Sequence, residues 1–264
     1  MKKIITFENV TKSYNGKCII DSVSHDFYEG ESIAFSGHNG CGKSTMLKII
    51  AGFTRVNQGR VNYHKKVRFS YVPEKFPGLN ISMIKYLKSV ADMEGVSISV
   101  LNKLIEEFFL ENMINTKMNN MSKGSLQKVG VIQALMAPHD IILLDEPLSG
   151  QDMDSQEVFV DKIMELKKRG ITIFMSCHEK NLMDKLSDKV FTIKQGKIEK
   201  IEIDSNQDLL FKLYVKRNEK LRRWPEMQVV GNRYTLFVHR DEIKDTIMDL
   251  YGDEWEIVGL EEYI

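Results

Sequence analysis

The sequence lacks the features that would mark a membrane-spanning, secreted or broadly nucleic-acid-binding protein. No apolar run approaches the eighteen or so residues that a membrane span needs, and charged residues interrupt the N-terminus before a signal-peptide core could form. Lysine plus arginine and aspartate plus glutamate both total 37, so the formal net charge is zero, whereas a broad nucleic-acid-binding surface normally leaves a basic excess. We therefore expect a cytoplasmic protein that binds no nucleic acid and reaches a membrane only through another chain.

Cysteine is scarce as well. Cys18, Cys41 and Cys177 are too few and too scattered for a disulfide framework or a metal cluster. The length of 264 residues allows one substantial core with an appended module, or two small domains.

The sequence does contain a glycine-rich loop between a strand-like run, residues 32–35, and a helix-like run, residues 46–50. The loop residues are Gly37, His38, Asn39, Gly40, Cys41, Gly42, Lys43, Ser44 and Thr45. Strand, glycine loop and helix are the context that a phosphate-binding loop requires. The glycines let consecutive N–H groups point at phosphate oxygens, and the helix N-terminus adds partial positive charge. Lys43 would reach the β- and γ-phosphates, and Ser44 would offer its hydroxyl to Mg²⁺.

Two acids follow an unbroken apolar run, residues 141–144, which is typical of a central parallel strand buried on both faces. Ligands of open α/β sheets bind at the carboxyl ends of the strands, so Asp145 and Glu146 should emerge beside the phosphate loop. Asp145 would hold Mg²⁺, through water. Glu146 would accept a proton from the attacking water or orient it.

Three further sites are weaker when each is taken alone. Tyr14 stands at the end of a hairpin, signalled by Asn15-Gly16 between β-like runs, where its ring could stack on a purine or simply be a half-buried strand residue. His178 ends the β-rich run 171–178 and is either a structural strand-end residue or a contact for the γ-phosphate. Residues 121–125 open an apolar helix with N–H donors and a serine hydroxyl for an anion.

The order of these elements predicts an α/β fold. We expect a P-loop core with a mainly parallel sheet, an N-terminal antiparallel β subdomain with strands near residues 4–7 and 18–20, a strand over 67–72 and an inserted helical segment over 82–137. The expected domains are a phosphate-binding domain over residues 1–204, with its helical subdomain at about 78–138, and a C-terminal α+β module over 205–264. In that module Arg222, Arg223 and Trp224 form either a contact patch or a solvated face with one packing tryptophan.

Together these residues resemble one family, the ATP-binding subunits of ABC transporters, over about residues 4–200. Residues 37–45 resemble its Walker A loop, residues 141–146 its Walker B strand and residues 149–152 its D-loop. His178 resembles the family's switch histidine, and Tyr14 is similar to the aromatic residue that stacks on adenine. Residues 121–125 resemble the signature, which is usually Leu-Ser-Gly-Gly-Gln. The resemblance implies an ATP hydrolase with ATP and Mg²⁺ as cofactors.

The signature and one loop depart from the family's pattern. Lys123 stands where the first of two glycines is usual and Ser125 where glutamine is usual, while Ser122 and Gly124, the positions expected to bind γ-phosphate, remain. Glu74 replaces the family's glutamine after the strand at 67–72 and could still face Mg²⁺. A Ser-Lys-Gly signature with a Pro-Glu loop is similar to ATPases of the drug and antimicrobial-peptide export subgroup.

The resemblance also implies partners. A second ATPase subunit, expected to form a head-to-tail homodimer, would close its signature helix over the γ-phosphate, and the dimer would drive a membrane permease on a separate chain. The groove near Phe76-Pro77-Gly78 is the candidate docking surface for that permease. The alternatives are a soluble ABC ATPase serving an assembly process, such as iron–sulfur scaffold loading, and a nucleotide-dependent regulatory module.

Overall fold

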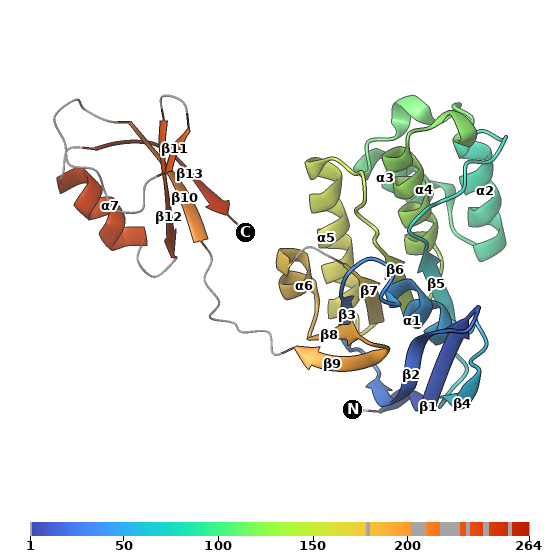
Figure 1. Cartoon of the computed structure of the whole chain (residues 1–264). Helices are drawn as coiled ribbons and strands as arrows, with labels where there is room; N and C mark the ends of the chain where they lie inside the picture. The colour runs from blue at the N-terminus through green and yellow to red at the C-terminus, as the bar shows by residue number, and fades with distance from the viewer. Residues whose placement is uncertain are drawn as a thin grey trace. The chain divides into compact units, whose positions relative to one another are not determined.

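Figure 1 shows the computed structural model of the chain. It describes residues 2–177, 180–201, 210–216, 228–230, 233–239, 243–252 and 255–263. The chain divides into two compact units, Met1–Ile203 and Asp204–Ile264. Across the described residues, no helix is both long enough and apolar enough to cross a bilayer.

The first unit begins with a three-stranded antiparallel sheet of β1 (Lys3–Tyr14), β2 (Lys17–Tyr28) and β4 (Gln58–Tyr63), in the order β2-β1-β4. The predicted hairpin is confirmed: Asn15 and Gly16 turn the chain with φ values of 49° and 80°, as a tight two-residue hairpin turn requires. The strands run well beyond the predicted segments, because residues such as Val10 and Val23 continue to be buried through bulged registers.

A six-stranded sheet forms the centre of this unit, in the order β5-β6-β7-β3-β8-β9. Its strands are β3 (Ser32–Ser36), β5 (Phe69–Val72), β6 (Ile141–Asp145), β7 (Thr172–Ser176), β8 (Lys189–Lys194) and β9 (Lys197–Ile201). All neighbouring pairs are parallel except β8 with β9. Every residue of β6 is buried, which confirms the predicted central strand. β5 is shorter than predicted, since Val67 and Arg68 precede it.

Helices cover the central sheet on both faces (Figure 1). On one face α1 (Lys43–Ile50) and the antiparallel sheet share a core with Phe35, Leu143 and Phe174. On the other face α4 (Lys123–Met136), α5 (Met153–Lys168) and α6 (Lys180–Leu186) pack against Leu144 and Met175. Adjacent residues of one strand thus enter different cores, because side chains alternate across a sheet.

The inserted helical segment is also confirmed. Between β5 and β6 lie α2 (Met83–Glu94), α3 (Ile98–Glu107), two short 3₁₀ turns (Glu111–Met113 and Met118–Asn120) and α4. The parallel strands β3, β6 and β7 end at one edge of the sheet, so the residues after them converge there.

The second unit is a small α+β module. It contains β10 (Leu210–Lys216), β11 (Gln228–Val230), β12 (Arg233–His239), α7 (Ile243–Gly252) and β13 (Glu256–Tyr263). The strands are antiparallel in the order β11-β12-β10-β13. Leu213, Leu236, Leu250 and Trp255 are among its buried core residues. Arg222, Arg223 and Trp224 lie outside the described residues.

Candidate active site

The loop between β3 and α1 has a backbone that requires glycine. Gly37 and Gly42 have φ values of 136° and 120°, in the left-handed region that disfavours other residues. A Cβ added at Gly42 would lie 2.9 Å from Cγ2 of Ile19 on β2, so the loop also approaches the hairpin too closely for a larger residue. The chain therefore turns sharply at these glycines, and α1 begins directly afterwards at Lys43.

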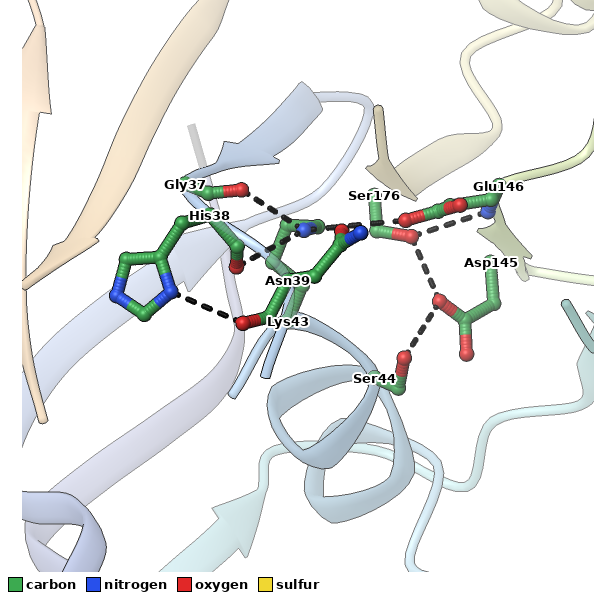
Figure 2. A network of polar contacts seen from close by, with 8 residues as sticks. All are labelled: Gly37, His38, Asn39, Lys43, Ser44, Asp145, Glu146 and Ser176. Carbon is green, nitrogen blue, oxygen red and sulfur yellow. Dashed lines mark hydrogen bonds and ion pairs between the residues drawn. The ribbon is translucent and has the colours of Figure 1, made fainter. Parts of the chain in front are cut away.

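The Lys43 side chain turns back along this loop (Figure 2). Its Nζ donates to the Gly37 carbonyl at 2.9 Å and to the His38 carbonyl at 3.5 Å, and it lies 3.8 Å from Oε1 of Glu146. The side chain is only 5% exposed. A buried ammonium needs such acceptors, and phosphate oxygens could replace these carbonyl oxygens as its partners.

Asp145, at the end of β6, accepts three hydrogen bonds. Ser44 Oγ donates to Oδ1 at 2.9 Å, Ser176 Oγ to the same oxygen at 2.6 Å, and Tyr71 Oη to Oδ2 at 3.0 Å. Burial, together with the charge of Asp145, raises the pKa of Tyr71, so this hydroxyl stays protonated and donates.

The oxygen donors around Asp145 fit Mg²⁺. A hydroxyl and a carboxylate, Ser44 and Asp145, lie 2.9 Å apart, and Mg²⁺ at nucleotide sites takes one or two protein oxygens together with phosphates and waters. No group of three or more His, Cys, Asp or Glu side chains that could hold a metal occurs among the described residues.

Glu146 has a strained backbone and a fixed position. Its φ is 47°, which is uncommon outside glycine and is found at functional sites. Its N–H lies 3.0 Å from the Ser176 hydroxyl and 3.2 Å from the Ser176 carbonyl, so the end of β7 holds the residue in place. Ser176 therefore contacts both acids (Figure 2), and it was missed from the sequence, as was Tyr71, because neither belongs to a recognised motif.

One cavity of about 360 Å³ joins many of the predicted residues. Its lining comprises Tyr14, Ile19, Asn39, Gly40, Gly42, Lys43, Ser44, Thr45, Glu74 and Glu146. Tyr14 is 44% exposed, and Nζ of Lys12 lies 4.6 Å from its ring centroid. The predicted loop residues Gly37, His38 and Cys41 do not line the cavity. The carbonyl oxygens of Gly37 and His38 accept hydrogen bonds from Lys43. His38 Nδ1 lies 2.9 Å from the Asn39 carbonyl oxygen, and Cys41 is half-buried.

The signature residues lie elsewhere. Ser122 caps α4, accepting a hydrogen bond from the Ser125 N–H at 3.1 Å, and Gly124 packs against Gly150. Neither Ser122 nor Gly124 lines the cavity around Lys43. His178 lies outside the described residues.

Comparisons with known proteins identify the family. The ABC transporter family model matches residues 20–149. The ABC transporter ATP-binding protein MJ1023 of Methanocaldococcus jannaschii is 32% identical over 267 residues, covering 96% of this chain and 100% of that protein. The zinc import ATP-binding protein ZnuC of a Wolbachia species is 28% identical over 222 residues, covering 80% of this chain and 90% of that protein.

A solved structure gives the same result for the fold. The dimeric post-hydrolysis state of the ATP-binding cassette MJ0796, bound to ADP and Pi, matches with a TM-score of 0.67 at 22% identity, covering 74% of this chain and 97% of that one. The chain belongs to the ATP-binding proteins of ABC transporters and carries an ABC-type ATPase domain. The expected family, fold and enzyme class are thereby confirmed.

Proposed function

We propose that this chain binds ATP with Mg²⁺ on residues 37–45 and hydrolyses it at the edge formed by β3, β6 and β7. The observation that carries the proposal is the meeting of one buried lysine with two carboxylates at this edge. Lys43 lies 3.8 Å from Glu146, while Ser44, the next residue, bonds Asp145. Charges of both signs, placed together beside a helix N-terminus, suit a metal-bound triphosphate.

Each residue has a distinct task in this proposal. Lys43 exchanges its carbonyl acceptors for β- and γ-phosphate oxygens, and Tyr14, at the cavity rim, stacks on the adenine. Ser44 and Asp145 would hold Mg²⁺, and Glu74, which lines the same cavity as Ser44, could contribute a further carboxylate. Mg²⁺ supplies neutralisation of phosphate charge when bound. Glu146 orients the attacking water and accepts its proton, and His178 contacts the γ-phosphate.

A second subunit completes the site. Ser122 is exposed at the start of α4 and is absent from the lining of its own chain's cavity. In a head-to-tail, two-fold dimer each chain would offer Ser122 and Gly124 to the γ-phosphate held by the other. A homodimer satisfies this arrangement with one type of chain.

The dimer would act on a permease made by another chain, at the cytoplasmic face of a membrane. Export of a drug, an antimicrobial peptide or a lipid-like cargo is supported by the Ser-Lys-Gly signature and by Glu74. Import is the competing direction, because several relatives are named for import, either of zinc or of spermidine and putrescine. A stoichiometric polytopic partner in a detergent pull-down supports transport, whereas a soluble scaffold partner supports the assembly alternative.

Mixing two inactive variants tests the shared site. Lys43→Ala removes the lysine that we propose contacts phosphate, and Ser122→Ala removes the serine that each chain would offer to the site of the other. In a mixed dimer, the site that combines Lys43 of one chain with Ser122 of the other is intact, so one site of two is restored. Random assembly makes half of the dimers mixed, so the equimolar mixture should recover up to about a quarter of the wild-type ATPase rate per chain, which is the value for two independent sites. Each variant alone, at the same total protein, is the control. A mixture no more active than the variants alone, at saturating protein, would refute a shared site.

A further inference from the structure

Two lysines of α4 reach the residues that follow β6. Lys123, the first residue of α4, donates from Nζ to the Ser149 hydroxyl at 2.7 Å. Further along the helix, Lys128 is 8% exposed, and its Nζ lies 2.7 Å from Oδ2 of Asp152. Both partners belong to residues 146–152, here called the connecting turn. The helix that starts with the signature is therefore attached to the connecting turn at two points.

The backbones between these two points are in close contact. A Cβ added at Gly124 would lie 2.0 Å from the carbonyl oxygen of Gly150, so the start of α4 packs directly on the connecting turn. Within the turn, the Ser149 N–H donates to the Glu146 carbonyl at 3.2 Å, and Gln151 Nε2 donates to the Pro147 carbonyl at 2.8 Å. A turn bonded in this way moves as a unit, because shifting one residue stretches bonds to the others.

The connecting turn runs between two different nucleotides in the proposed dimer. Glu146, at its start, lines the cavity of its own chain. Ser122 directly precedes Lys123 and would contact the ATP held by the second subunit. A displacement of Glu146 by its own nucleotide would pass through Ser149 to Lys123, and so to the neighbouring site.

We propose that Lys123 is a positioning residue that couples the two ATP sites through its hydrogen bond to Ser149. The inference rests on the proposed dimeric function. Lys123 stands where the signature of the family usually has glycine, which has no side chain with which to reach Ser149. A hydrogen bond from an ammonium group is stronger than one between neutral groups, and this one lies at an exposed position where it can break and form again.

Steady-state ATPase measurements on the full chain test the coupling. With two communicating sites, we expect wild-type rates to rise cooperatively with ATP, with a Hill coefficient approaching about 2. Lys123→Met and Ser149→Ala should each lower the coefficient toward about 1, while the rate at saturating ATP stays within about twofold, because both sites are then filled in every dimer. The double variant should have a Hill coefficient no lower than that of either single variant, since both substitutions remove the same hydrogen bond.

Two further variants separate coupling from general damage. Lys123→Arg keeps a charged donor and should retain cooperativity. Lys103→Met removes an exposed lysine of α3, whose Nζ lies 3.8 Å from Glu107, and should behave as wild type. Thermal unfolding of each variant provides a readout of folding that is independent of the Hill coefficient.

The possible results separate this inference from the proposed function. A wild-type chain that binds or hydrolyses no ATP refutes the proposed function itself. A wild-type chain that hydrolyses ATP without cooperativity, or variants with an unchanged Hill coefficient, overturn only the coupling. A lowered Hill coefficient in Lys123→Met that Ser149→Ala does not reproduce also overturns the proposed coupling. In that case Lys123 would act by contacting the phosphate held by the second subunit.

Discussion

The phosphate loop and the signature segment differ in how far one chain completes them. Around the loop, Lys43 and Asp145 are buried, and their partners come from their own chain. At the signature, Ser122 and Lys123 are exposed, and their hydrogen bonds join them to Ser125 and Ser149 rather than to the cavity. In the proposed function, the phosphate loop receives its ligand within one chain, and the signature segment is presented to the ligand of a second chain.

This difference separates binding from turnover. Buried, paired charges are costly to assemble and are positioned in advance, so nucleotide affinity should belong to the single chain. An exposed serine at a helix start costs little to maintain, and in the proposed dimer it would contribute only once a second chain brings a phosphate to it. Variants of the phosphate loop should therefore lose nucleotide binding, whereas variants of the signature segment should keep binding and lose turnover.

The largest expected effect is the loss of nucleotide binding in Lys43→Ala. Removing a buried charge that contacts phosphate should weaken ATP binding on the order of 100-fold or more, as measured by titration of monomeric protein. Lys48→Ala, which removes an exposed lysine of the same helix, is the matched control. Ser122→Ala should bind as wild type in this assay; weak binding by that variant would show that the two halves are not separate.

Glu146→Gln should come next, with an effect on turnover. The amide cannot accept a proton, so hydrolysis should fall by roughly 10²- to 10⁴-fold while ATP binding is retained. The unhydrolysed nucleotide should also hold the chains together as a dimer, detectable by size-exclusion chromatography with ATP. Glu157→Gln, an exposed change on α5, is the control. Near-normal hydrolysis would remove Glu146 from the catalytic role.

A moderate effect is expected for Ser176→Ala. The Ser176 hydroxyl contacts Asp145 Oδ1 and the Glu146 N–H, so its loss leaves a buried carboxylate with one donor fewer. We expect about 1–3 kcal/mol of lost stability in denaturant unfolding, together with slower hydrolysis. Ser187→Ala is matched in chemistry, because that buried hydroxyl contacts the Met175 sulfur at 3.8 Å and no acid of the site. Equal losses in both variants would mean that Ser176 matters for packing alone.

The smallest effect should come from Asp152→Asn, on the signature side. Lys128 and Ser155 lower the pKa of Asp152 in the folded chain, and asparagine preserves the helix cap while removing the charge. A lowered folded-state pKa stabilises the fold above the unfolded value of about 3.9, and this stabilisation is lost as pH falls through the folded value.

Unfolding measurements at several pH values can detect this effect. The Asp152→Asn variant should be less stable than wild type by about 1 kcal/mol at pH 7 and at pH 5, because the carboxylate is largely exposed, and the difference should shrink below about pH 4. Asp154→Asn in the first turn of α5 is the control. A difference that grows as pH falls would contradict the ion pair with Lys128.

The motifs were predictable because their chemistry is local. Gly37, Gly42 and Lys43 are close in sequence, and strand, loop and helix follow one another without a break, so the phosphate loop could be recognised from spacing alone. Ser176 and Tyr71 could not be found in this way. Each is an ordinary strand residue. Tyr71 and Ser176 meet Asp145 only because their strands, β5 and β7, lie on either side of β6 in the sheet.

The sequence by itself determined the family to which this protein belongs, and it pointed to the glycines, the lysine and the two acids that we propose handle a phosphate. The tertiary structure decided which residues share a site, namely that Ser176 and Tyr71 join Asp145, and that Lys123 meets Ser149 away from the cavity. The physical reason is that strand order and helix packing arise from burial summed over the whole core, whereas a motif records only the neighbours of one residue along the chain.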